Sequence, residues 1–97
     1  MKVVMAGEGA IARKHLAGIE RIDGVEVVSL AGGNEADTRA LAAERGIDHW
    51  SIDLDDCLAQ PGVDAVILAT PTQLHAAQAV QVLAARKHVL VEIPMAD

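Results

Sequence analysis

Hydrophobic and polar positions along this chain follow two alternating patterns, short apolar runs and longer stretches with helical spacing. Runs such as 3–6 and 63–69 are bounded by glycine, proline or threonine, which is typical of strands buried in a sheet. After the first run, Ile11, Leu16 and Ile19 recur at the spacing of one helix face. We therefore expect strands at 3–6, 25–30, 49–52, 63–69 and 88–91, and helices at 10–21, 35–45, 53–59 and 74–86.

Residues that favour helix ends support these boundaries. Asn34 is expected to cap the start of the helix at 35–45, and Gly46 to end it. Thr72 is the candidate N-cap of the helix at 74–86. The inner face of that helix is predicted to carry Ala76, Val80 and Leu83.

Strands and helices alternate along the chain, and this order predicts an α/β fold with a doubly wound parallel sheet of the Rossmann type. Right-handed crossovers then give the strand order 3-2-1-4-5, after which a sixth strand normally follows. Residues 89–91 would be an uncovered apolar edge if the chain ended at Asp97. We therefore expect 1–97 to be one dinucleotide-binding domain, truncated after its fifth strand, of a longer polypeptide whose substrate domain is absent.

The loop after the first strand carries the main chemical signal. Gly7-Glu8-Gly9-Ala10-Ile11-Ala12 fits the pattern G-x-G-x-x-G/A, directly after a strand and at the start of a helix. The first glycine permits a tight turn, the second allows a pyrophosphate to approach the backbone, and Ala12 allows close helix packing. Free amides at the helix start would then bind the phosphates. The same pattern also occurs as a glycine turn that binds no ligand.

The tip of the second strand bears on which dinucleotide binds. NAD sites usually place an acid there, whereas NADP sites avoid one and often offer a base. This tip reads Gly32-Gly33-Asn34, without an acid before Glu35 and without a base. The missing acid favours NADP, and the missing base leaves NAD open. Arg39, one turn into the next helix, is either a contact to a 2′-phosphate or part of a solvated face.

Composition and charge exclude several classes of protein. A net charge of -6 argues against a nucleic-acid or anionic-membrane partner, and no apolar stretch approaches the ~18 residues of a membrane span. Cys57 is the only cysteine, so no internal disulfide can form and a cytoplasmic location is expected. Two neighbouring acids disfavour its thiolate, which indicates a packing role. The four histidines have no metal-ligand spacing, so no metal is expected.

Two later segments make the chain resemble a known family. The segment 65–75 contains Thr70-Pro71 followed by His75, and the segment 87–96 reads Lys-His-Val-Leu-Val-Glu-Ile-Pro-Met-Ala. Together with the glycine loop and His15, these segments resemble the N-terminal domain of the Gfo/Idh/MocA oxidoreductases over essentially all 97 residues. The resemblance implies binding of a nicotinamide dinucleotide, a small-molecule substrate held by a second domain, and a homo-oligomer of the full-length protein.

The resemblance also implies roles for individual residues. Thr70 and Pro71 would line the nicotinamide half of the cofactor, with His75 either beside it or serving only to cap and pack its helix. Glu92 would face the ribose and nicotinamide at the end of the fifth strand. Where the family usually has a lysine that positions or protonates the substrate hydroxyl, this chain has Ile93. An apolar side chain does no acid–base chemistry, so catalytic residues are expected beyond Asp97.

The ending Glu-Ile-Pro-Met-Ala-Asp at 92–97 narrows the resemblance to a subgroup that acts in protocatechuate 4,5-cleavage. Its members use NADP to oxidise a cyclic hemiacetal, although a basic residue at the second-strand tip is replaced here by Gly33. The leading expectation is hydride transfer from a hydroxyl or hemiacetal carbon to NADP or NAD. A sugar or polyol dehydrogenase of the same family and a non-catalytic nucleotide-binding module are alternatives. A methyltransferase fits poorly, because the second-strand tip lacks an acid.

Overall fold

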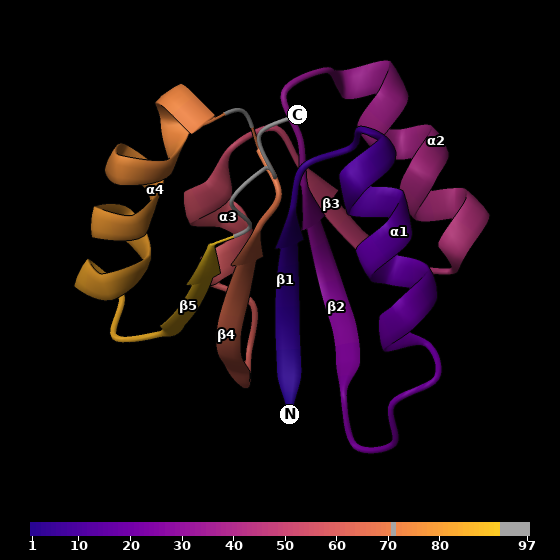
Figure 1. The fold of residues 1–97 in the computed structure, drawn as a ribbon, viewed down its shortest axis with the longest axis horizontal. Helices are drawn as coiled ribbons and strands as arrows, with labels where there is room; N and C mark the ends of the chain where they lie inside the picture. Colours follow the sequence, from indigo (N-terminus) through magenta and orange to yellow (C-terminus); the bar gives the residue numbers. More distant parts are fainter. Residues whose placement is uncertain (71, 92–97) are drawn as a thin grey trace, which may run out of the picture.

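In a computed structural model, residues 1–70 and 72–91 are described, and they form one parallel sheet with helices on both faces (Figure 1). The strand order is β3-β2-β1-β4-β5, and every pairing is parallel, as the sequence predicts. The strands are β1 (Lys2–Ala6), β2 (Glu26–Ala31), β3 (His49–Ser51), β4 (Val63–Leu68) and β5 (His88–Val91). Their carboxyl ends therefore meet along one edge of the sheet, which is where this fold binds ligands.

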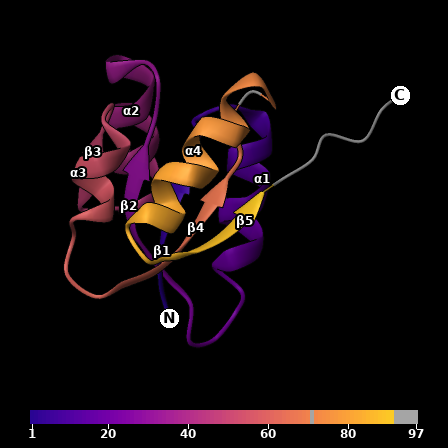
Figure 2. The ribbon, with the colours of Figure 1, turned by 90° about the vertical axis from the view of Figure 1, so that its left-hand side faces the viewer.

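Four helices cover the two faces of the sheet. They are α1 (Ala10–Ile19), α2 (Glu35–Arg45), α3 (Leu54–Leu58) and α4 (Thr72–Ala84). One buried cluster joins α1 and α2 to the sheet, and a second joins α3 and α4 to the opposite face. Figure 2 shows α1 and α3 on opposite sides of the strands. The central strand β1 supplies both clusters, with Val4 and Ala6 on one face and Met5 on the other, because side chains alternate along a strand.

Element boundaries agree with the sequence to within about two residues, the usual scatter of helix ends. The Asn34 side chain caps α2 by accepting from the Asp37 amide at 2.9 Å, and Gly46 ends that helix in the left-handed region (φ 68°), so both predictions are confirmed. The prediction for Thr72 is wrong, because Thr72 is already the first helical residue of α4.

The predicted inner face of α4 is also wrong. Val80 and Leu83 are 67% and 59% exposed, and Ala76 is exposed as well. The sheet-facing stripe is instead His75, Ala79 and Val82, of which Val82 is fully buried. The small and apolar residues of α4 lie on several sides of the helix, so the hydrophobic pattern alone does not distinguish the buried side from the exposed side.

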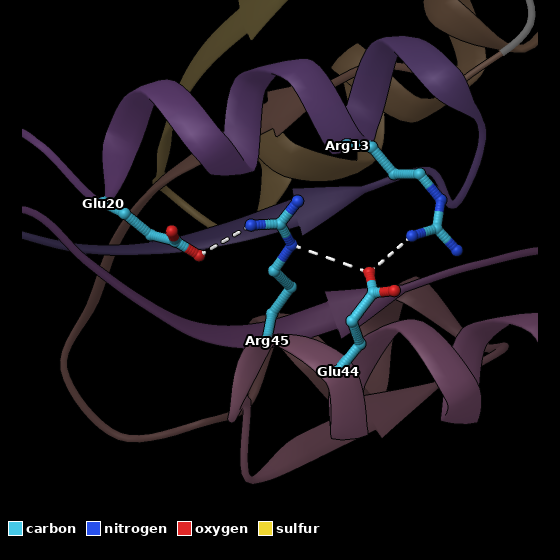
Figure 3. Close-up of polar contacts among 4 residues, drawn as sticks. All are labelled: Arg13, Glu20, Glu44 and Arg45. Atoms are coloured by element: carbon cyan, nitrogen blue, oxygen red, sulfur yellow. Dashed lines mark hydrogen bonds and ion pairs between the residues drawn. The ribbon is translucent and has the colours of Figure 1, made fainter.

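Ion pairs link α1 and α2 (Figure 3). Arg13 of α1 pairs with Glu44 of α2, and Arg45 of α2 pairs with Glu20 just past the end of α1 at 3.1 Å. Arg45 also lies 3.7 Å from Glu44. These contacts supplement the apolar packing of α1 on α2, and both helices start at the carboxyl edge of the sheet.

Candidate dinucleotide-binding site

Gly7 forms the turn where three strand ends meet. Its amide donates to the Ala31 carbonyl at the end of β2 (2.7 Å), while Ala69, just after β4, donates to the Ala6 carbonyl (2.8 Å). Gly7 has φ +129°, and a β-carbon on it would lie 2.6 Å from the Ala69 carbonyl oxygen. Only glycine satisfies both the positive φ and the close approach of β4. The first glycine is thus required by the fold itself.

Gly9 has a different environment. It is the N-cap of α1, with extended backbone, and no heavy atom of the described residues comes within 4 Å of a β-carbon placed on it. The starts of α2 and α3 are capped by the side chains of Asn34 and Asp53, whereas Gly9 has no side chain to offer. The first amides of α1 therefore have no side-chain cap, and the described residues leave open space beside Gly9. This arrangement fits a bound pyrophosphate.

Glu8 reaches across from the loop to the tip of β2. Its carboxylate accepts hydrogen bonds from the amides of Gly33 (2.9 Å) and Asn34 (3.2 Å). A β-carbon on Gly32 would lie 2.5 Å from Glu8 Oε2 and 1.9 Å from Thr38 Oγ1, so the missing side chain at Gly32 makes room for both. The predicted tip residues are thus brought together with Glu8. The sequence placed Glu8 in the phosphate loop, and nothing in the linear motif indicates its contact with β2.

Thr70 and His75 lie together at the turn after β4. His75 is 8% exposed, and its Nε2 lies 2.6 Å from the Thr70 carbonyl oxygen. Because a carbonyl only accepts, this contact requires a proton on Nε2. The Thr70 hydroxyl donates to Gln78 of α4. These bonds connect the β4 turn to α4, so His75 has a structural role whatever else it does.

Some of the predicted site residues are not described by the structure, and two others contribute their backbone. Pro71, Glu92 and Ile93 lie outside the described residues. The backbone of Ala10 and Ile11 opens α1, with Ala10 exposed, in keeping with the free amides of this turn.

Other chemically notable residues lie away from this edge or have structural partners. Cys57 is fully buried against the Leu30 carbonyl, and burial raises the pKa of its thiol. His49 Nδ1 lies 2.7 Å from the Ser29 hydroxyl between β3 and β2, and Trp50 packs on the α1/α2 cluster. Among residues 1–70 and 72–91, no group of three or more metal-ligating side chains gathers. No helix of this described part is long and apolar enough to cross a membrane.

A parallel sheet with this strand order, a glycine loop after β1 and an uncapped helix start define a dinucleotide-binding protein of the Rossmann class. Comparison with known proteins agrees. Residues 1–97 match the family described as "Oxidoreductase family, NAD-binding Rossmann fold". The chain belongs to this Gfo/Idh/MocA oxidoreductase family and forms its NAD-binding domain.

Individual relatives support the assignment. The chain is 50% identical over all 97 residues to 4-carboxy-2-hydroxymuconate-6-semialdehyde dehydrogenase from Sphingobium sp. (strain NBRC 103272 / SYK-6), covering 31% of that protein. Biliverdin reductase from Synechocystis sp. PCC 6803, solved with biliverdin and NADP+, matches 98% of this chain and 30% of its own, at TM-score 0.86 and 32% identity.

The WlbA dehydrogenase from Bordetella pertussis, solved with NADH and UDP-GlcNAcA, matches 99% of this chain and 30% of its own, at TM-score 0.87 and 37% identity. The chain thus spans about a third of the length of these relatives, whose structures include both an NADP and an NAD complex.

Proposed function

We propose that residues 1–97 are the cofactor-binding part of a longer dehydrogenase that oxidises a hydroxyl or cyclic hemiacetal carbon. The observation that carries this proposal is the glycine loop, in which Gly7 is required by the fold while Gly9 has open space beside it among the described residues and α1 starts without a side-chain cap. The 50% identity to a semialdehyde dehydrogenase favours a cyclic hemiacetal from aromatic-ring cleavage as the substrate. A nicotinamide ring, when bound, supplies the acceptor for the hydride.

The residues of this chain would bind and orient the cofactor. Amides at the start of α1 would hold the pyrophosphate, and Glu8 and the β2 tip would face the adenosine half. Thr70, held by Gln78 and His75, would form a rigid edge beside the nicotinamide half. With Pro71 and Glu92, it is proposed to complete that part of the site.

The hydroxyl proton of the substrate must also be removed. Ile93 cannot take this proton, because its side chain is a hydrocarbon. We therefore assign the base, and the groups that bind the substrate's carboxylates, to a second domain encoded beyond Asp97. The same domain is proposed to form the oligomer interface.

The test begins by sequencing the gene beyond the codon for Asp97, which gives the full reading frame. The full-length product is purified and supplied with NAD+ or NADP+ and a panel of substrates, while the absorbance of the reduced nicotinamide is followed. We expect kcat/KM for the cyclic hemiacetal of 4-carboxy-2-hydroxymuconate-6-semialdehyde to exceed that for sugars and polyols by at least about tenfold. A preference for a sugar or polyol would identify another dehydrogenase of the family. No reduction with any substrate would indicate a non-catalytic nucleotide-binding module.

A further inference from the structure

In this fold, the acidic residue that binds the 2′-hydroxyl of the adenosine ribose usually lies at the tip of the second strand. Here that tip has no acidic side chain of its own before the start of α2. The carboxylate of Glu8 nevertheless lies at the tip, because it accepts hydrogen bonds from the amides of Gly33 and Asn34. We propose that Glu8, from the glycine loop, makes this chain select NAD over NADP. This inference rests on the dinucleotide-binding role of the chain and not on its substrate.

The first reason is that Glu8 occupies the donors that a 2′-phosphate would use. The tip offers two neighbouring amides, and both already donate to the Glu8 carboxylate, at 2.9 and 3.2 Å. An incoming 2′-phosphate must displace this internal anion before the same two amides can bind it. A ribose 2′-hydroxyl makes no such demand, because a hydroxyl can donate to a carboxylate that stays in place.

The second reason is charge. Glu8 lies at the end of α2 that carries Glu35 and Asp37 in its first turn. The cation nearest in sequence to the tip is Arg39, whose side chain is exposed to solvent. A doubly charged phosphate at this place would meet carboxylates, and like charges this close repel. The absence of an acid in the linear segment favoured NADP, but that premise does not hold once the loop and strand are folded together.

The missing side chain at Gly32 allows the Glu8 carboxylate to reach the tip of β2. A β-carbon on Gly32 would collide with Glu8 Oε2 at 2.5 Å, whereas one on Gly33 would stand 3.7 Å from Oε1, at ordinary contact distance. The carboxylate therefore fits into the space left by Gly32. Its two hydrogen bonds to the tip distinguish Glu8 from an acid that has no partner.

The test compares the dissociation constants of NAD+ and NADP+ by isothermal titration calorimetry, with no substrate present. The protein should bind NAD+ at least about tenfold more tightly than NADP+, a difference of about 1.4 kcal/mol. Glu8→Gln keeps the shape and removes the charge, so it should reduce this ratio by about tenfold, mainly through tighter binding of NADP+. Glu26→Gln makes the same change in charge at the opposite end of β2 and should leave the ratio unaltered.

Cofactor-binding results test the role of Glu8, whereas turnover results test the proposed dehydrogenase activity. Wild-type protein that prefers NADP+, or binds both equally, would overturn the role of Glu8 even if the variant failed to fold. An unchanged ratio in a folded Glu8→Gln variant would show that Glu8 only ties the loop to β2, and would overturn it too. A protein that prefers NAD+ but oxidises no substrate would count against the proposed dehydrogenase activity and not against the role of Glu8.

Discussion

Two glycines two positions apart in one loop are glycine for different reasons. At Gly7 the backbone has φ +129° and the end of β4 leaves no space for a side chain. At Gly9 the backbone is extended and the described residues leave open space around the position of a β-carbon. The fold requires the first glycine, whereas no contact among the described residues requires the second.

This difference predicts opposite effects of one substitution. Gly7→Ala should lower the free energy of unfolding by about 2 kcal/mol or more, since it adds strain and a clash with backbone atoms. Gly9→Ala should change it by less than about 1 kcal/mol, the usual size of an N-cap effect, but should weaken NAD+ binding. Urea denaturation and calorimetric titration of both variants would check this. Equal losses of stability would contradict the assignment of roles.

Whether the role of a single residue can be predicted from the sequence depends on how far along the chain its contacts lie. Asn34 and Gly46 act on backbone groups a few residues away, so the sequence identifies them. The contact of Glu8 with Gly33 spans 25 residues and depends on how the ends of β1 and β2 lie beside each other. No local sequence pattern encodes this long-range contact, and for this reason the sequence predicts a place for Glu8 in the loop but not its contact with the tip.

At the scale of elements, alternating strand and helix patterns predicted the whole sheet, because parallel strands joined by right-handed crossovers allow few arrangements. The orientation of α4 was not predictable in the same way. Its apolar residues lie on several sides, and packing against β4 and β5 buries Val82 while Val80 and Leu83 stay exposed. The sheet below the helix, rather than the helix itself, determines which side is buried.

Val80 and Val82 provide a matched pair in this helix. Val82→Ala should lower the free energy of unfolding by about 2 kcal/mol, because it removes buried apolar groups and leaves a cavity. Val80→Ala should stay within about 0.5 kcal/mol of the wild type, as is usual for an exposed position. Thermal or urea unfolding measures both. A larger loss at Val80 than at Val82 would mean that α4 packs through its other face.

At the scale of the whole molecule, Cys57 lies where α3 meets the sheet. It belongs to the cluster that joins β1, β2 and β4 to α3 and α4, and none of its surface is exposed. The pKa of its thiol is raised first by loss of solvation and further by the charge of Asp56. A reagent therefore reaches the thiol only when the core opens, and the thiol stays protonated in the folded state at neutral pH.

We expect a disulfide reagent to label Cys57 slowly in the native protein and at once in urea. The unfolded thiol ionises at its ordinary pKa and the folded thiol only above it, so the free energy of unfolding should fall as pH rises through the unfolded value, about 8.5. Labelling kinetics and urea denaturation across this range test both statements. Rapid labelling of the folded protein would contradict the burial of Cys57.

The close fit of Glu8 beside Gly32 constrains the order in which these two positions can change during evolution. While Glu8 is present, even a methyl group at position 32 would collide with its carboxylate, so the glycine is held in place by a residue 24 positions away in the chain. If Glu8 were replaced first by a smaller residue, one of the two obstacles at position 32 would be removed and Thr38 alone would remain. A side chain at position 32 would therefore be expected only in descendants in which both Glu8 and Thr38 had already been replaced.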